Sequence, residues 1–162
     1  MQVLIVDDNI TRQTELSSAF TWAGFQPSTT DSHSVAERCI RRGWFDLLVM
    51  SERVGGRLTH QHALLAEWRN PMVATILLTP RHDVDTDELF LLLPSLHCLL
   101  APDTDADLIT QLSIASVIGA ASRSLPLVLT ADQMIDELVD AVPIFASTRM
   151  PSPAFEHMRR QA

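Results

Sequence analysis

The stretch VLIVDDN, residues 3–9, places four consecutive apolar side chains directly before two aspartates, Asp7 and Asp8. Apolar residues at every position, instead of every second one, predict a strand that is buried on both faces. Such strands occur in parallel sheets that carry helices on both sides. Two adjacent carboxylates repel each other unless a cation lies nearby or one of them takes a proton. The stretch therefore predicts a parallel sheet with a candidate site where this strand ends.

The pattern of a short strand followed by a helix recurs along the chain. Helical spacing of apolar residues follows each strand, and the last of these helices is predicted over residues 104–122. The predicted strands cover residues 3–6, 26–30, 47–50, 72–78 and 96–100, of which 26–30 is polar and reads as an edge strand. This alternation indicates an α/β fold with a doubly wound parallel five-stranded sheet.

Polar or small residues follow the four buried strands of this predicted sheet. They are Asp7 and Asp8, Ser51, Thr79 and Ala101. In doubly wound sheets, ligands bind beyond the carboxyl ends of the strands, where the strand order reverses. We therefore expect these residues to surround one site.

The chain resembles the receiver domains of response regulators over residues 1–122. The resemblance rests on VLIVDDN, FDLLVMS, ATILLTP and LLAP and on the separations between them. It implies a flavodoxin-like (βα)5 receiver fold. In that family, an aspartate takes a phosphoryl group from a histidine kinase, and an acidic pair holds Mg²⁺.

The resemblance also implies where the family's phosphorylation pocket would lie in this chain. The acidic pair, the phosphoacceptor, the hydroxyl switch residue, the lysine and the proline after it correspond to Asp7 and Asp8, Ser51, Thr79, Ala101 and Pro102. A carboxylate can accept a phosphoryl group and bind Mg²⁺, whereas a serine hydroxyl needs a base and is a weak metal ligand. The missing lysine would have neutralised phosphoryl charge. We predict a phosphorylation-independent pseudoreceiver with no catalytic residues, metal or cofactor.

Two arginines follow the strand ends and are candidates to neutralise the acidic pair. Arg53 lies two residues after Ser51, and Arg81 lies just after Thr79. Either guanidinium could reach the carboxylates and hold the pocket in one state. The alternative is that both arginines are solvated.

The helix predicted over residues 104–122 carries more apolar residues than one sheet-facing stripe needs. We expect Leu108, Leu112 and Ala115 to face the sheet. A second set forms a candidate dimer or partner face, namely Ile114, Val117, Ile118 and Ala121. Cover from the C-terminal segment is the alternative, and both can hold. On this basis we predict a homodimer.

Residues 123–162 are predicted to form a C-terminal extension to the receiver-like domain of residues 1–122. The extension contains one helical pattern, capped by Thr130 and ended by Pro143, and then a loose tail. One helix cannot make a helix-turn-helix. The net charge of -8 on 162 residues also argues against broad binding to phosphate backbones, so nucleic-acid binding is not expected.

Targeting and metal signals are not apparent in the sequence. The chain shows no pattern of a signal peptide or a membrane span, so we expect a cytoplasmic protein without membrane association. His60 and His62 are two residues apart in a predicted helix and do not share a face, so we expect no metal site there.

These observations favour a regulatory module of bacterial signal transduction or gene regulation that acts by protein–protein contacts. Two alternatives remain at the level of sequence. One is a genuine two-component response regulator with an unusual phosphorylation site. The other is a transcription antiterminator-type regulator that acts on nucleic acid through residues 123–162. None of these readings predicts an enzyme.

Overall fold

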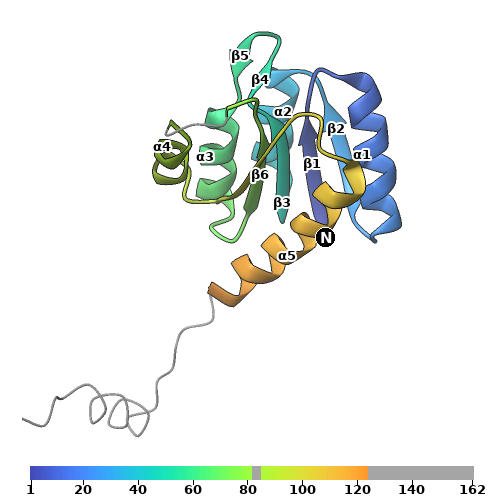
Figure 1. The fold of residues 1–162 in the computed structure, drawn as a ribbon. Coiled ribbons are helices and arrows are strands. Elements are labelled where there is room, and N and C mark those ends of the chain that lie inside the picture. The colour runs from blue at the N-terminus through green and yellow to red at the C-terminus, as the bar shows by residue number, and fades with distance from the viewer. Residues whose placement is uncertain (82–84, 124–162) are drawn as a thin grey trace, which may run out of the picture. The chain divides into compact units, whose positions relative to one another are not determined.

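Strands and helices alternate through residues 1–81 and 85–123, which the computed structural model describes (Figure 1). In chain order the elements are β1 Gln2–Val6, α1 Ile10–Trp22, β2 Gln26–Thr30, α2 His33–Arg42, β3 Leu47–Ser51, β4 Arg53–Val54, β5 Arg57–Leu58, α3 His60–Arg69, β6 Ala74–Leu78, α4 Asp85–Leu92, β7 Leu96–Leu100 and α5 Ala106–Arg123. The predicted alternation of strands and helices is confirmed.

The main sheet has five parallel strands in the order β2-β1-β3-β6-β7. In its centre, Val3 pairs with Leu47, and Leu47 pairs with Ala74. The chain moves outward from β1 to β2 and then crosses back to β3, so the strand order reverses between β1 and β3. This is the flavodoxin-like order, as predicted, and it places the switch point between the ends of β1 and β3.

Helices cover both faces of this sheet, which explains the continuous apolar runs (Figure 1). Alternate residues of each central strand enter two separate cores: Leu4 and Leu48 pack with α2, α3 and α4, whereas Val3 and Leu47 pack with α1 and α5. Side chains alternate across a strand, so a strand buried on both faces needs an apolar residue at every position.

A small second sheet follows β3, where the sequence had suggested only a loop. Strands β4 and β5 form an antiparallel hairpin in which Arg53 pairs with Leu58 and Val54 pairs with Arg57. Gly55 and Gly56 make its turn with φ of 55° and 76°. Two consecutive positive φ angles are typical of the tight hairpin turn that Gly-Gly favours. The hairpin rises beyond the carboxyl ends of the central strands (Figure 1).

Two elements begin later than predicted, because side chains bind the backbone just before them. The fourth strand was predicted from residue 72, but β6 begins at Ala74. Asn70 explains the difference: it donates to the Phe45 carbonyl at 2.8 Å and accepts from the Met72 amide at 3.0 Å, which holds this segment in a turn. Helix α5 begins after Asp105, whose carboxylate accepts from the Asp107 amide at 2.9 Å, and not at Thr104.

The faces of α5 also differ from those predicted. Ile109 and Ser113 are fully buried, and Val117 packs against the same core, so these residues form the row that faces the sheet. Val117 therefore does not belong to the exposed set. Leu108, which was expected to face the sheet, is 46% exposed. Ile109, Ser113 and Val117 are each four residues apart, and residues at this spacing lie on one face of a helix.

The extension predicted over residues 123–162, including its helix, lies outside the described residues except for Arg123. Within residues 1–81 and 85–123, no helix combines the length and the apolar character that crossing a membrane requires.

Candidate functional site

Asp7 lies at the carboxyl end of β1, next to the switch point, and is only 1% exposed. Its carboxylate accepts hydrogen bonds from the Asn9 amide at 2.7 Å and from the Ser51 hydroxyl at 2.9 Å. Arg12 adds a bidentate ion pair, with Nη2 donating to Oδ1 at 2.9 Å and Nε donating to Oδ2. Four hydrogen bonds therefore hold this buried carboxylate in place, and the two from Arg12 come from a charged donor.

Arg12 connects three parts of the fold around this carboxylate. Besides binding Asp7, it donates to the Ser51 hydroxyl at 2.9 Å and to the Pro102 carbonyl at 2.7 Å. The first turn of α1 directs Arg12 toward the strand ends, because Asn9 caps the helix by accepting from the Arg12 amide at 3.1 Å. The guanidinium therefore links β1, β3 and the segment after β7.

The cation beside Asp7 is thus a different arginine from the two that the sequence suggested. Arg81 binds another carboxylate, and Arg53 donates to the Gly56 carbonyl at 3.1 Å. All 12 basic residues of the chain are arginines, so no lysine is available for this role. The signal that could have identified Arg12 is its place in the first turn after a strand that ends on an acid.

The two neighbouring aspartates have separate roles. Asp8 is exposed, and its carboxylate accepts from the Gly55 amide in the hairpin at 3.1 Å. Asp7 is turned inward and is already neutralised by Arg12. The receiver resemblance implies that an acidic pair holds Mg²⁺, an ion that prefers oxygen ligands. A guanidinium on Asp7 and a hydroxyl at position 51 do not fit that ion.

A second buried carboxylate, Glu52, lies one residue after Ser51 and was not predicted. It is 4% exposed and accepts from the Thr79 hydroxyl at 2.6 Å. Arg81 pairs with its other oxygen at 2.7 Å, and the Arg81 amide also donates to Thr79 at 3.1 Å. The switch-position hydroxyl is therefore held by a carboxylate of the chain itself. An acid directly after a buried strand was the available sequence signal.

His60 lies beside this second carboxylate, with Nε2 at 3.9 Å from Glu52 Oε1. Burial lowers the pKa of His60, and Glu52 opposes that shift, while Arg81 and Arg53 add to it. His60 is therefore mainly neutral at neutral pH. Among the described residues, no group of three histidine, cysteine or acidic side chains is placed to hold a metal ion.

Ala101 and Pro102 complete the set of residues predicted at this edge. Ala101 is half-buried and offers only a methyl group, while the Pro102 carbonyl accepts from Arg12. The structure thus connects Asp7, Ser51 and Pro102 through Arg12, and it connects Thr79 to Glu52.

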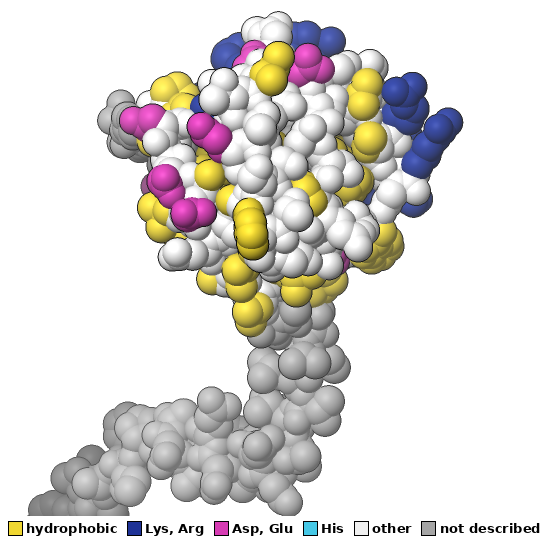
Figure 2. All heavy atoms as spheres, turned by 90° about the vertical axis from the view of Figure 1, so that its right-hand side faces the viewer, with side chains coloured by type: hydrophobic (Ala, Val, Ile, Leu, Met, Phe, Trp, Pro, Cys, Tyr) yellow, Lys and Arg dark blue, Asp and Glu magenta, His cyan; other side chains and the backbone are white. Residues whose placement is uncertain are grey.

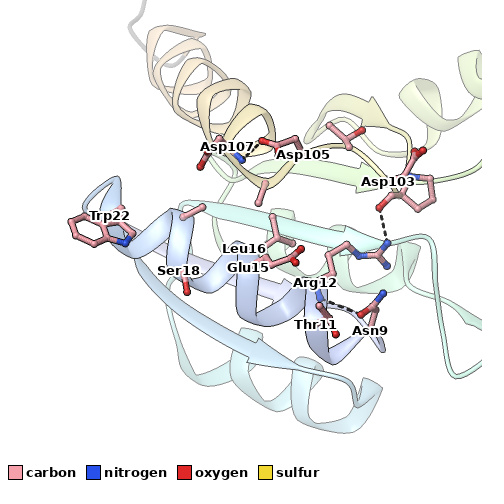
Figure 3. Close-up of a pocket in the computed structure, with 14 residues that line it drawn as sticks. Asn9, Thr11, Arg12, Glu15, Leu16, Ser18, Trp22, Asp103, Asp105 and Asp107 are labelled. Atoms are coloured by element: carbon pink, nitrogen blue, oxygen red, sulfur yellow. Dashed lines mark hydrogen bonds between the residues drawn. The ribbon is translucent and has the colours of Figure 1, made fainter.

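A groove of about 560 Å³ runs along the outer side of Arg12, between α1 and residues 102–107 (Figure 3). Glu15 lines it from α1, Asp103 and Asp107 line it from the opposite side, and Trp22 lies at one end. The Arg12 bond to Pro102 joins the two walls of the groove. The same side chain therefore contributes to both the inner pocket and the outer groove.

Exposed apolar residues lie on the helices that flank β7, an edge strand. They are Phe90, Leu91 and Leu92 of α4, and Leu108, Ile114 and Ile118 of α5. Figure 2 shows hydrophobic side chains gathered at the lower end of the described part of the molecule. Of the face predicted from the sequence, Ile114 and Ile118 are exposed, and the side chain of Ala121 lies outside the described residues.

No protein-family model and no curated protein matches this sequence. Among solved structures, the chain is similar to a CheY-like response regulator receiver domain protein from Methanospirillum hungatei JF-1, with a TM-score of 0.64, 13% identity, and coverage of 76% of this chain and 98% of that one. It is also similar to a response regulator receiver protein from Sinorhizobium medicae WSM419, with a TM-score of 0.65, 16% identity, and coverage of 74% of this chain and 96% of that one.

A third similar structure is described as an adenylate cyclase from Rhodopirellula baltica, with a TM-score of 0.65, 18% identity, and coverage of 87% of this chain and 98% of that one. At these identities the likeness defines the fold. The described part of the chain therefore has the fold of response-regulator receiver domains, as the resemblance of its strand-end motifs implied.

Proposed function

We propose that this protein is a receiver-like regulatory module of bacterial signal transduction that acts through protein contacts and without phosphorylation. The observation that carries this proposal is the bidentate pair of Arg12 and Asp7, together with the Arg12 bond to Ser51. In this arrangement a cation of the chain lies where the receiver resemblance implies a metal ion and a phosphoryl group.

The contacts of Ser51 argue against its phosphorylation. Its hydroxyl donates to Asp7 and accepts from Arg12, both at 2.9 Å, so its proton and an oxygen lone pair are engaged. A serine nucleophile needs a base that is free to take its proton. Ser51 is also 6% exposed, so a phosphodonor would first have to displace the guanidinium.

The contacts of Thr79 support a fixed conformation. The Glu52 carboxylate accepts a hydrogen bond from the Thr79 hydroxyl at 2.6 Å, and Arg81 forms an ion pair with that carboxylate. A group that switches needs two arrangements of similar free energy. Here one arrangement pairs the carboxylate with both the hydroxyl and the guanidinium, so the module is constitutive and is controlled by its partners.

Protein contact through α4, β7 and α5 is the second part of the proposal, and a homodimer is its simplest form. Exposed apolar patches mark interaction sites; Ile114 and Ile118 are 38% and 58% exposed on α5, and Leu91 is 85% exposed on α4. Because no phosphate controls it, such a dimer would depend on concentration or on a competing partner.

Phosphoryl transfer can be tested by intact mass after incubation with acetyl phosphate and Mg²⁺. We expect no added phosphoryl group on the wild-type chain. The variant Arg12→Ala with Ser51→Asp and Ala101→Lys restores the family's acceptor and lysine and serves as the matched control. A phosphoryl group on the wild type that is lost in Ser51→Ala would overturn the proposal and favour a genuine response regulator.

Association can be tested by analytical ultracentrifugation at micromolar concentration, where a monomer of 18.0 kDa and a dimer are resolved. We expect a dimer that Ile114→Glu with Ile118→Glu dissociates. Val117 is not a suitable target, because it packs against the core. Trp22→Glu is the matched control, since Trp22 is 91% exposed on α1. A wild-type monomer would contradict the dimer.

A further inference from the structure

His33, at the start of α2, bridges two other elements through its two ring nitrogens. Its Nε2 lies 2.9 Å from the Val54 carbonyl of β4, and its Nδ1 lies 2.9 Å from His62 Nε2 of α3. The two imidazoles are close, with ring centroids 5.1 Å apart. His62 is 1% exposed, so this contact lies inside the protein.

The contacts fix the protons of both rings. A carbonyl oxygen can only accept, so His33 Nε2 must carry the proton that binds Val54. Neutral His33 then has a lone pair at Nδ1, and His62 Nε2 must donate to it. It follows that His62 Nδ1 carries a lone pair, and this buried atom has no hydrogen-bond partner in the described part of the chain. Each ring has one tautomer, and each depends on the other.

The surroundings of His62 oppose its protonation. The pKa of His62 is lowered to about 4: burial is the largest cause, His33 and Arg57 of the hairpin add to it, and Glu37 of α2 partly opposes them. Glu37 and Arg41 of α2 also line a cavity of about 220 Å³ next to His62. Glu37 is bound to Arg41 at 2.9 Å, so its charge is already matched. A proton on His62 would therefore be a buried cation with little compensation.

A proton on His33 meets a different obstacle. It would bind at Nδ1, so that two N–H groups would face each other across the gap to His62. His62 could accept only by moving its own proton to Nδ1, which is buried without an acceptor. An unpaired buried donor is costly. The folded arrangement therefore accommodates two neutral imidazoles and no additional proton.

We propose that the His33–His62 pair is an acid-released latch, which holds the β4–β5 hairpin against α2 and α3 while both rings are neutral and frees it when either gains a proton. This inference is independent of the absence of phosphorylation. The hairpin also holds the Asp8 carboxylate through the Gly55 amide. Release of the hairpin would therefore free the Asp8 carboxylate from its hydrogen bond at the edge of the receiver-type pocket.

The tautomers give a direct test on the full wild-type chain. Two-dimensional ¹H–¹⁵N NMR that detects long-range couplings in imidazole rings assigns the protonated nitrogen. At pH 7.5 we expect both His33 and His62 to carry their proton on Nε2. A His62 ring protonated on Nδ1 would overturn the hydrogen-bond arrangement on which the latch rests.

Amide hydrogen exchange tests the release itself. Between pH 7.5 and pH 5, after correction for intrinsic exchange, we expect protection of the Gly55 and Arg57 amides to fall by at least about tenfold, while that of Ile76 in the central sheet is retained. In His62→Gln the fall should be much smaller, because a rotated amide can either donate to neutral His33 or accept from the protonated ring.

A matched control separates the latch from general acid effects. His97→Gln replaces a histidine of β7, on the opposite edge of the sheet, and should retain the full wild-type response. Equal loss of hairpin protection in wild type and His62→Gln would overturn the latch, and so would an unchanged wild-type hairpin at pH 5. If His62→Gln does not fold, the tautomers and the wild-type exchange still decide the question.

Discussion

Replacing Arg12 by alanine tests the central contact of the site. The change removes a guanidinium that binds Asp7 through two nitrogens, donates to Ser51 and holds the Pro102 carbonyl. Asp7 is 1% exposed in the wild-type chain, so its charge loses its counterion at a buried position. We therefore expect a clear loss of stability from one side chain on the surface of α1.

The magnitude follows from what Asp7 retains. Breaking a fully buried ion pair by removing one partner costs about 3–5 kcal/mol. Here the Arg12 side chain is 18% exposed, and Asp7 keeps its bonds from the Asn9 amide and the Ser51 hydroxyl. These factors reduce the expected loss to about 2–3 kcal/mol. In the Asp7→Asn background, where no charge is left unpaired, the loss should fall below about 1 kcal/mol.

Urea unfolding of the wild type, Arg12→Ala, Asp7→Asn and the double variant measures the Arg12→Ala loss in both backgrounds, provided that the m-value is unchanged. Arg53→Ala is the matched control, because it removes an exposed arginine that the sequence also suggested for the pocket and that binds only the Gly56 carbonyl among the described residues. Two results would refute the reasoning. One is an Arg12→Ala loss no larger than that of Arg53→Ala, and the other is an equal Arg12→Ala loss in the wild-type and Asp7→Asn backgrounds.

Two further predictions concern pH and glycine. The pKa of His62 is lowered to about 4 in the folded chain, so His62 binds a proton more tightly in the unfolded chain. The His62 contribution to the free energy of unfolding should therefore be full above pH 6.5 and should decrease by about 2–3 kcal/mol as the pH falls to 4. Urea melts should show a flatter profile for His62→Gln, and a parallel profile would contradict the assignment. Gly56 has φ of 76° and open space where a Cβ atom would lie, so Gly56→Ala should lower stability by about 1 kcal/mol through backbone strain alone. Gly119 of α5 is the control, because a Cβ atom there would also meet open space but the backbone is helical. Gly119→Ala should raise stability by about 0.5–1 kcal/mol, and equal effects of the two changes would count against the backbone explanation.

Local patterns were sufficient to predict the main sheet, because each buried strand carries its own signature. A run such as VLIV must be covered on both faces wherever it lies, and helices of the right length stand between such runs. The ends of the first and third strands also predicted that Asp7 and Ser51 lie close together, since parallel strands place their carboxyl ends at one edge. Asp7 and Ser51 are indeed in contact, at 2.9 Å.

The sequence by itself determined the sheet, the order of its elements and the strand ends at which the site lies. Tertiary structure decided the charge partners, because the chain offered several arginines within reach. Arg12 binds Asp7 from the first turn of α1, and Arg81 binds Glu52 from the segment after β6. Tertiary structure also brought His33 to His62, which are 29 residues apart. Side-chain reach and burial select among such pairs, and both depend on how helices pack rather than on spacing along the chain.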